Sequence, residues 1–441
     1  MEKNGNCNRK KKYNIEHEII FLLDSDRKNT GENDDSVYRI SSLEEFYSLL
    51  EKNKELVDER LNYKIEAVSS EKREIAQQCW QLLSFMCFHK RSKVRLNRKM
   101  KVFNEEICEL DERHILECTR EFSRINSGGK CIRGALVNLG YHIMNECTEE
   151  YSDELALALE IFQTAILIHD DIIDHAVLRR KQDTIPTSFC GKWKIRGGFD
   201  EETMSDTADS LAICAGDLGM YLANQKITIA YGEREFIGEL MRYYNQMIIN
   251  TIQGEILDVY LPFEEKNHPS SGEELVHSIT EIYRLKTAWY TVIGPFCLGM
   301  ILGGATSENI QEAEEFAEKL GIAFQIKDDI LGVFTSEKEM GKDAGSDIAE
   351  FKQTLLYAYV AQQKDYKEQL LLYYGRENLS TQDIQAVCEI LEKSGALKYA
   401  ETEMERYFSE AEEKLNGMKF IAENQKTKLL GLIWYLKMRK Y

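Results

Sequence analysis

The sequence predicts an all-α protein, and three observations support this prediction. Proline, which breaks the interior of a helix, occurs four times in 441 residues and not at all after Pro295. The strong helix formers Glu, Lys, Leu and Ala are plentiful. Apolar residues recur with helical periodicity along most of the chain, and no segment alternates strongly in the manner of a β-strand. With 43% hydrophobic residues, the chain can bury a substantial core and is not disordered throughout.

Residues 1–100 are predicted to form an N-terminal extension that is disordered at its start and helical afterwards. Residues 1–36 are polar, a composition that orders poorly. A helix is expected to start at Ser42, because Ser42 and Glu45 have the spacing of a capping box, and another helix is expected over residues 71–90. The run from Lys90 to Lys101 holds seven cations. This run suits a solvated helix face or linker, or alternatively a contact with anionic lipid or a protein partner.

Residues 101–441 are predicted to form the main domain. Helical periodicity recurs at residues 105–126, 131–148, 152–176, 207–230, 233–260, 272–305, 308–334, 350–373, 381–394 and 397–437. The stretch Thr287–Ser307 carries no charge, but it contains several glycines and Pro295. A membrane span tolerates such residues only with help from its neighbours, so a buried core helix is expected and no transmembrane segment is predicted.

Charge and cysteine content limit the class of protein. The net charge is −19, from 75 acidic and 56 basic residues, and a nucleic-acid binder would normally be basic. An anionic ligand must therefore be met by local cations or by metal ions. Eleven cysteines, without a C-x-x-C pair, indicate reduced thiols and a cytoplasmic location. No signal peptide is expected at the N-terminus.

The segment Ile168–Asp174 contains three carboxylates close together and follows an apolar helical run. Asp170 and Asp174 lie one helical turn apart on the same face, and Asp171 flanks them. Like charges packed together are unfavourable unless cations bind them. Magnesium is a good match, because it takes one or two protein carboxylates and completes its octahedron with water and phosphate oxygens. A solvated acidic helix end is the alternative for this first aspartate motif, Asp170–Asp174, if it is considered alone.

A second aspartate motif, Asp328-Asp329, follows another apolar run. Cations accompany both motifs, at Lys130, Arg133, Arg179, Arg180, Lys286, Lys342 and Lys352. Two carboxylate clusters surrounded by Arg and Lys indicate a site for two diphosphates, one of them bridged by metal. Such a site turns a diphosphate into a leaving group by neutralising the charge that it develops.

In this order and spacing, the motifs resemble those of the trans-isoprenyl diphosphate synthases, or polyprenyl synthetases, of the geranylgeranyl and longer-chain kind. The matching segments are Gly128–Gly134, Asp170–Asp174 with Leu178–Arg180, Gly216-Asp217, Lys286-Thr287, Phe324–Leu331, Gly341-Lys342 and Ser346–Lys352. Each segment alone is a weak signal, whereas the ordered set is specific. Three positions depart from the common pattern: Cys131 replaces Arg, Gly134 replaces Pro, and Gly332 replaces the last Asp of the second motif.

The resemblance implies the isoprenoid synthase fold, an antiparallel helix bundle around a deep central cavity, usually as a homodimer. It also implies Mg²⁺-dependent head-to-tail prenyl transfer from an allylic prenyl diphosphate to isopentenyl diphosphate, with about three ions bound. Carried over by position, the metal ligands are Asp170, Asp171, Asp174 and Asp328, supported by Asp329. The allylic diphosphate is assigned to Arg179, Lys286, Thr287, Gln325, Lys342 and Lys352. Isopentenyl diphosphate is assigned to Lys130, Arg133, Gln163 and Arg180. The predicted catalytic residues are Asp170, Asp171, Asp174, Lys286 and Asp328.

Product length is predicted from the helix that carries the first motif. In the family, an aromatic residue four or five positions before the first aspartate blocks the product tunnel. Here these positions are Ile166 and Ala165, and the nearest large ring is Phe162, one turn deeper. A helical turn rises by about 5.4 Å, comparable to one isoprene unit, so a product of about twenty carbons or more is expected.

Two other functions are weighed. A terpene cyclase would ionise the same allylic substrate but needs no isopentenyl site, so Lys130, Arg133 and Arg180 argue against it. A non-catalytic subunit of a heteromeric synthase can lose motif aspartates, and five are present here.

The tail Trp434–Tyr441 ends in several cations, which suits a charged helix end or a flap over the substrate site. The residues of the N-terminal extension indicate no function.

Overall fold

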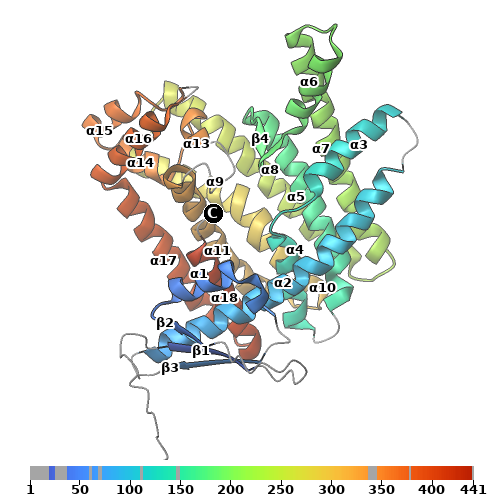
Figure 1. Cartoon of the computed structure of the whole chain (residues 1–441), viewed down its shortest axis with the longest axis vertical. Helices are drawn as coiled ribbons and strands as arrows, with labels where there is room; N and C mark the ends of the chain where they lie inside the picture. The colour runs from blue at the N-terminus through green and yellow to red at the C-terminus, as the bar shows by residue number, and fades with distance from the viewer. Residues whose placement is uncertain are drawn as a thin grey trace, which may run out of the picture. The chain divides into compact units, whose positions relative to one another are not determined.

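Helices dominate the computed structural model (Figure 1), which confirms the predicted all-α class. The structure describes residues 19–24, 37–58, 62–67, 72–109, 113–145, 149–335, 345–376 and 379–439. Contacts divide the chain into two units. The first unit comprises residues 1–90 and 427–438, and the second comprises residues 91–426 and 439–441. This division falls inside α2 (Arg73–Ile107), one continuous helix that includes the cationic run Lys90–Lys101.

The first unit contains a three-stranded antiparallel sheet that local sequence patterns did not predict. β1 (Ile19–Asp24) lies between β2 (Val37–Ile40) and β3 (Asn62–Ala67), with Phe21 opposite Tyr38 and Ile65. Because β1 lies within residues 1–36, the expectation that this segment orders poorly is wrong for residues 19–24. The strand is a short continuous apolar run, and such a run gives no period-2 signal.

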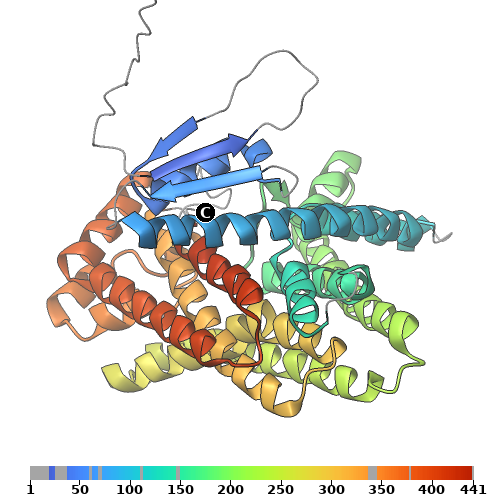
Figure 2. The ribbon, with the colours of Figure 1, turned by 90° about the horizontal axis from the view of Figure 1, so that it is seen from below.

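A helix covers this sheet. α1 (Leu43–Lys52) starts at Ser42 as predicted, and the Ser42 hydroxyl accepts a hydrogen bond from the Glu45 N–H at 3.2 Å. Figure 2 shows α1 beside the three strands, and the rings of Phe21 and Phe46 pack edge to face, with their centroids 5.3 Å apart. A short 3₁₀ turn, η1 (Lys54–Leu56), follows. The predicted helix start at Ser42 is therefore confirmed.

The C-terminal helix α18 (Glu423–Met438) belongs, from Thr427, to the same unit as the N-terminal extension. A side chain at Gly431 would place its Cβ 2.0 Å from the Gln81 carbonyl oxygen, so the backbones of α18 and α2 touch here. The Trp434 indole N–H donates to Oε1 of Gln81 at 3.0 Å. The single helix expected over residues 397–437 is thus wrong, because the chain is extended at Met418 between α17 (Ala396–Gly417) and α18.

The second unit is a bundle of long helices. Its elements up to the first aspartate motif are α3 (Arg113–Asn126), α4 (Ile132–Met144), η3 (Glu149–Ser152) and α5 (Asp153–Ile173). The next are the short strands β4 (Leu178–Arg179) and β5 (Gln182–Asp183), then α6 (Ile185–Arg196), α7 (Glu201–Tyr231), α8 (Ile237–Asn267) and α9 (Gly272–Ile282). The π-helical segment η4 (Tyr283–Ile293), α10 (Gly294–Leu302) and α11 (Ser307–Phe334) follow. The last are α13 (Ser346–Ala349), α14 (Leu355–Ala361), α15 (Lys364–Leu370), α16 (Thr381–Lys393) and α17. α5 packs along α7, and α11 packs along α17 and η4 (Figure 1).

The uncharged stretch is a core helix, as predicted. Within the described residues, the continuous helical stretch Gly272–Leu302 is long and apolar enough to cross a membrane. However, 78% of its most apolar window is buried inside the structure.

The helix α6 was not expected from periodicity; Pro186 occupies its first turn, a position where proline favours a helix start.

Candidate active site

The first aspartate motif is held by one guanidinium group. α5 ends at Ile173, and Arg179 follows on the short strand β4, where it contacts the aspartates. Arg179 donates from Nε to Oδ1 of Asp171 at 2.7 Å and from Nη2 to Oδ2 of Asp170 at 3.0 Å. Burial raises the pKa of Asp171 to about 6, although the Arg179 cation acts in the opposite direction. Asp171 is therefore a desolvated carboxylate that depends on the Arg179 cation.

Lys286 joins the first aspartate motif to α8. Its Nζ lies 3.3 Å from Oδ1 of Asp170, 2.9 Å from Oε2 of Glu255 and 2.7 Å from Oδ2 of Asp258. Gly254 makes this approach feasible, because a Cβ there would lie 2.2 Å from the Lys286 backbone nitrogen. Burial raises the pKa of Glu255 to about 7, against the lowering effect of Lys286. Glu255 and Asp258 were not predicted from the sequence, where their only signal was an acidic pair three residues apart in an apolar helix.

The second aspartate motif lies on α11 within a chain of hydrogen bonds. Asp329 accepts from the Tyr283 hydroxyl and, at 2.7 Å, from Nε2 of Gln325. The Thr287 hydroxyl donates to Oε1 of Gln325 at 2.6 Å. Burial raises the pKa of Asp329 to about 7, although Lys352 and the Tyr283 hydrogen bond favour its charged form. The structure thus brings together Thr287, Gln325 and Asp329, and it adds Tyr283, which was not predicted.

Asp328 is paired with the C-terminal tail. The buried guanidinium of Arg439 donates to Oδ1 of Asp328 and lies over the Phe324 ring, 4.3 Å from its centroid. One of the tail cations therefore reaches the second aspartate motif. Lys342 lies outside the described residues.

At Gly332, where the usual second motif has its last aspartate, a carboxylate from another segment, that of Asp347, lies nearby. A Cβ at Gly332 would lie 2.5 Å from Oδ2 of Asp347, so the Asp347 carboxylate occupies the space that a side chain at Gly332 would need. Lys352 Nζ lies 3.7 Å from Oδ1 of the same aspartate, and the Asp347 charge raises the pKa of Lys352. The departure at Gly332 therefore leaves a carboxylate at this place.

Two of the predicted isopentenyl residues, Lys130 and Arg180, lie at the loop between α3 and α4. Gly128 and Gly129 have φ values of +96° and +89°, which L side chains rarely adopt. A Cβ at Gly129 would lie 3.0 Å from Nη1 of Arg180, so the absence of a side chain lets the guanidinium approach the loop. Arg133 is buried, donates to the Thr291 hydroxyl at 2.7 Å and lies 4.0 Å above the centre of the Tyr290 ring.

Glu160 is a further residue of this region that the sequence analysis missed. The side chain is buried on α5 and accepts the Gly134 N–H at 2.8 Å. Burial raises the pKa of Glu160, while the nearby cations Arg133 and Arg180 favour its charged form. The predicted residue Gln163 lies half-buried one turn further along the same helix, and Lys130 is exposed.

The residues predicted to set product length line the interior side of α5. Phe162 is fully buried, and its ring packs edge to face against Tyr244 of α8, with the centroids 6.0 Å apart. Ala165 is also fully buried, and a Cβ at Gly219 of α7 would lie 2.9 Å from its own Cβ. Ile166 is half-buried. Large side chains at these positions would therefore meet α7 or α8.

Comparison with known proteins identifies the family. The family model described as polyprenyl synthetase matches residues 117–391, more than half of the chain. This chain belongs to the polyprenyl synthetase family. The predicted family and the predicted enzyme class, a prenyltransferase, are thereby confirmed. The match begins within α3, after the sheet and α2.

Several curated polyprenyl synthetases are similar to the chain. A geranylgeranyl diphosphate synthase of Sulfolobus acidocaldarius is 29% identical over 294 residues, which cover 66% of this chain and 81% of the relative. A short chain isoprenyl diphosphate synthase of Methanothermobacter thermautotrophicus is 31% identical over 281 residues, which cover 63% and 76%. A geranylfarnesyl diphosphate synthase of Aeropyrum pernix is 28% identical over 316 residues, which cover 71% and 92%.

A solved polyprenyl synthetase structure confirms the predicted fold. The geranylgeranyl pyrophosphate synthase of Corynebacterium glutamicum, complexed with isoprenyl diphosphate and magnesium, has a TM-score of 0.70 at 24% identity. The match covers 80% of this chain and 99% of that chain. The chain therefore has the isoprenoid synthase fold. The roles of individual site residues stay predictions.

Proposed function

We propose that this polyprenyl synthetase extends an allylic diphosphate with isopentenyl diphosphate to a product of about twenty carbons or more, with Mg²⁺ as its cofactor. The observation that supports this most is the separation of the cations into two groups. Arg179 and Lys286 contact the first aspartate motif, whereas Arg180 contacts the Gly129 loop. Two groups of cations suit two diphosphates, and a terpene cyclase would need one group.

The donor set fits magnesium. The proposed ligands Asp170, Asp171, Asp174 and Asp328, supported by Asp329, offer hard oxygen donors. Within the described residues, no three acidic, histidine or cysteine side chains already converge as a metal site. Mg²⁺ needs only one or two protein carboxylates for each ion, because phosphate oxygens and water complete the shell. When bound, the metal supplies charge neutralisation for the departing diphosphate.

The protein's own side chains supply positioning and further charge. Arg179 and Lys286 hold the carboxylates of the first motif and face the place where the allylic diphosphate develops negative charge. Arg133 and Arg180 would hold isopentenyl diphosphate, and both lie near the buried carboxylate of Glu160. The allylic C–O bond breaks, a C–C bond forms to the double bond of isopentenyl diphosphate, and a proton is lost.

One assay tests this function against its alternatives. The purified protein is incubated with Mg²⁺ and farnesyl diphosphate, with and without labelled isopentenyl diphosphate. Label in a longer prenyl diphosphate supports the proposal. Hydrocarbon formed without isopentenyl diphosphate would indicate a cyclase, and no turnover until a partner chain is added would indicate a subunit of a heteromeric synthase.

Adjacent arginines are expected to serve different substrates. Arg180→Ala should raise KM for isopentenyl diphosphate about tenfold or more, because its guanidinium lies at the Gly129 loop. Arg179→Ala should instead lower kcat and raise KM for the allylic substrate, because Arg179 holds Asp170 and Asp171. Steady-state kinetics with each substrate varied in turn measure both effects. Equal changes in both KM values for each variant would refute the separation.

Substitutions on α5 are expected to change product length. Ala165→Phe should shorten the product, because the added ring cannot fit against Gly219 of α7 and would narrow the space left for the product chain. Phe162→Ala should lengthen it by opening space beside Tyr244, at a stability cost of about 3 kcal/mol. Chromatography of the dephosphorylated products measures the distribution. If neither substitution moves the distribution, α5 does not form the tunnel wall.

We further propose that the protein is a homodimer joined through α8. Exposed apolar side chains follow one face of this helix at Ile249, Ile252, Ile256, Tyr260 and Phe263. The double variant Ile252→Glu with Ile256→Glu should be monomeric, because burying charge in an apolar interface is costly. Sedimentation velocity measures the mass, and Leu372→Glu, an exposed apolar residue elsewhere, is the control. A monomeric unmodified protein would contradict the proposal.

A further inference from the structure

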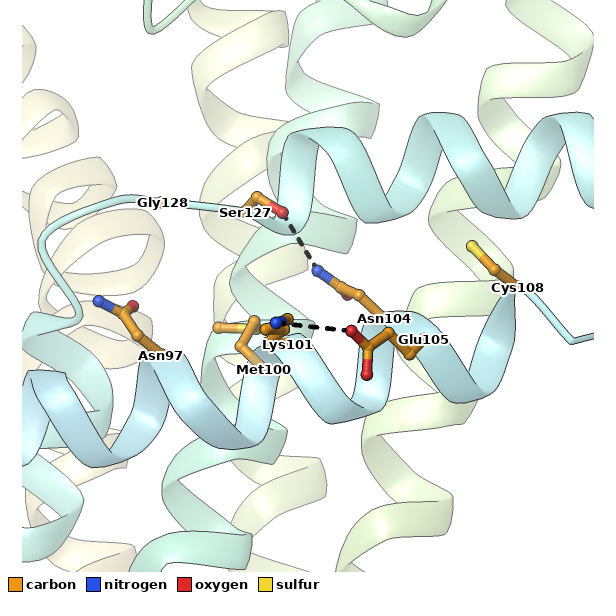
Figure 3. Close-up of a pocket in the computed structure, with 8 residues that line it drawn as sticks. All are labelled: Asn97, Met100, Lys101, Asn104, Glu105, Cys108, Ser127 and Gly128. Atoms are coloured by element: carbon orange, nitrogen blue, oxygen red, sulfur yellow. Dashed lines mark hydrogen bonds and ion pairs between the residues drawn. The ribbon is translucent and has the colours of Figure 1, made fainter.

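The second half of α2 supports the loop that carries Lys130. A cavity of about 360 Å³ lies between α2 and the end of α3. Figure 3 shows Asn104, one of its lining residues, directed toward Ser127. Nδ2 of Asn104 donates to the Ser127 hydroxyl oxygen and to the Ser123 carbonyl, both at 3.2 Å. These α2 residues precede the part of the chain that the family model matches.

Asn126, the last residue of α3, joins this support to α5. Its side chain is 1% exposed, and both ends of its amide have partners. Nδ2 donates to Oδ1 of Asn104 at 2.9 Å and lies 2.9 Å from Sδ of Met100. Oδ1 accepts from the Thr164 hydroxyl at 2.7 Å. One buried amide thus ties together α2, α3 and α5.

The loop that follows Asn126 depends on such anchoring. Gly128, Gly129 and Cys131 all have positive φ, so the segment cannot continue the helix and needs other contacts to hold its path. Cys131 is a second anchor to α2, because its Sγ lies 3.6 Å from Oδ1 of Asn97. Lys130 lies between the two anchors. Thr164, the partner of Asn126 on α5, directly follows Gln163, another of the predicted isopentenyl residues.

We propose that Asn126 is a positioning residue for the isopentenyl diphosphate site. It fixes the loop Ser127–Cys131 to α5 and α2, and thereby sets the position of Lys130 relative to Gln163. This inference rests on the proposed function, in which Lys130 binds isopentenyl diphosphate. The allylic residues Arg179, Lys286 and Gln325 lie on β4, η4 and α11, so the amide should act on one substrate only.

The variant Asn126→Leu tests the proposal, because leucine keeps the side-chain volume and removes every hydrogen bond. KM for isopentenyl diphosphate should rise about tenfold, the effect of losing one buried hydrogen-bonded contact, while kcat and KM for the allylic substrate change less than about threefold. Thr164→Val should act in the same direction with a smaller effect. The double variant should be no worse than Asn126→Leu, since the valine removes a bond that the leucine has already broken.

Asn138→Leu is the matched control. Asn138 on α4 is also a buried amide, and its Nδ2 donates to Ser92 at 2.6 Å and to Asp153 at 3.0 Å. Its replacement should lower thermal stability as Asn126→Leu does and leave KM for isopentenyl diphosphate unchanged. If Asn126→Leu does not fold, Thr164→Val carries the test.

A third variant separates this inference from the proposed function. Lys130→Gln should raise KM for isopentenyl diphosphate if the loop binds that substrate. If it does not, the proposed assignment of Lys130 fails, whatever Asn126 does. If Lys130→Gln raises KM while Asn126→Leu and Thr164→Val change stability alone, as Asn138→Leu does, the positioning role of Asn126 is overturned.

Discussion

Replacing Asp170 by alanine is expected to lower kcat at least about a hundredfold, the usual consequence of losing one group that neutralises charge in the transition state. Asp170 is the carboxylate at which the two cations of the allylic side meet, since it contacts both Arg179 and Lys286. Its loss removes a proposed metal ligand and the contact that brings these cations together. Single-turnover assays with saturating Mg²⁺ and both substrates measure the effect. A variant with a near-normal rate would contradict the metal assignment.

The same substitution should leave the fold intact. After Asp170 is removed, Arg179 still contacts Asp171, and Lys286 still contacts Glu255 and Asp258. The change takes one negative charge from a region in which carboxylates outnumber cations, so the melting temperature should shift by less than about 3 °C. Asp206→Ala, at an exposed position on α7, is the control that should change neither activity nor stability.

Apolar periodicity and capping residues predicted the helices whose position depends on their own sequence. The helices α5, α11 and α16 lie where apolar periodicity placed them, and the Ser42 cap starts α1. The sheet was missed because β1 pairs with Val37–Ile40 and Asn62–Ala67, segments distant in sequence, and periodicity reports only local order. The break between α17 and α18 was missed although a turn signal, Asn416-Gly417, directly precedes Met418, because the apolar periodicity resumes beyond it.

The residues of the candidate site also divide into those that local patterns predicted and those that they did not. Motif order and spacing predicted the aspartates and most of their cations, and the structure brings Asp170, Arg179 and Lys286 together. Charged residues that only balance the charge of the site were not predicted, because their own segments carry at most a weak signal. Glu255 and Glu160 are buried carboxylates whose partners lie on other helices. Their roles follow from packing, which is absent from a linear pattern.

Replacing Lys286 by methionine is expected to cost both activity and stability, and the stability cost should depend on pH. The methionine keeps much of the side-chain volume but leaves Asp170, Glu255 and Asp258 without the cation that they share. Breaking a buried ion pair by removing one partner typically costs about 3 kcal/mol or more. Because Lys286 is also proposed to hold the allylic diphosphate, kcat should fall about a hundredfold or more.

The direction of the pH effect follows from Glu255. Burial raises the pKa of this carboxyl from 4.5 to about 7 in the folded protein, even with Lys286 present. A raised folded-state pKa gives stability that is fully present below pH 4.5 and is lost as the pH rises through about 7. Without Lys286 the pKa rises further, so the folded variant binds more protons than the unfolded chain over a wider range. The difference in unfolding free energy between the two proteins should therefore grow from pH 5 to pH 8.

Urea unfolding at pH 5, 6, 7 and 8, without metal or substrate, measures this difference. We expect it to be about 1 kcal/mol or less at pH 5, where Glu255 of the variant takes up a proton, and about 3 kcal/mol at pH 8. Lys319→Met is the matched control, because Lys319 makes partly exposed ion pairs with Glu318 and Glu410 that should contribute less than about 1 kcal/mol at any pH. A destabilisation of Lys286→Met that is the same at all four pH values would show that the lost packing of the lysine, rather than the three carboxylates around it, determines the stability of this part of the site.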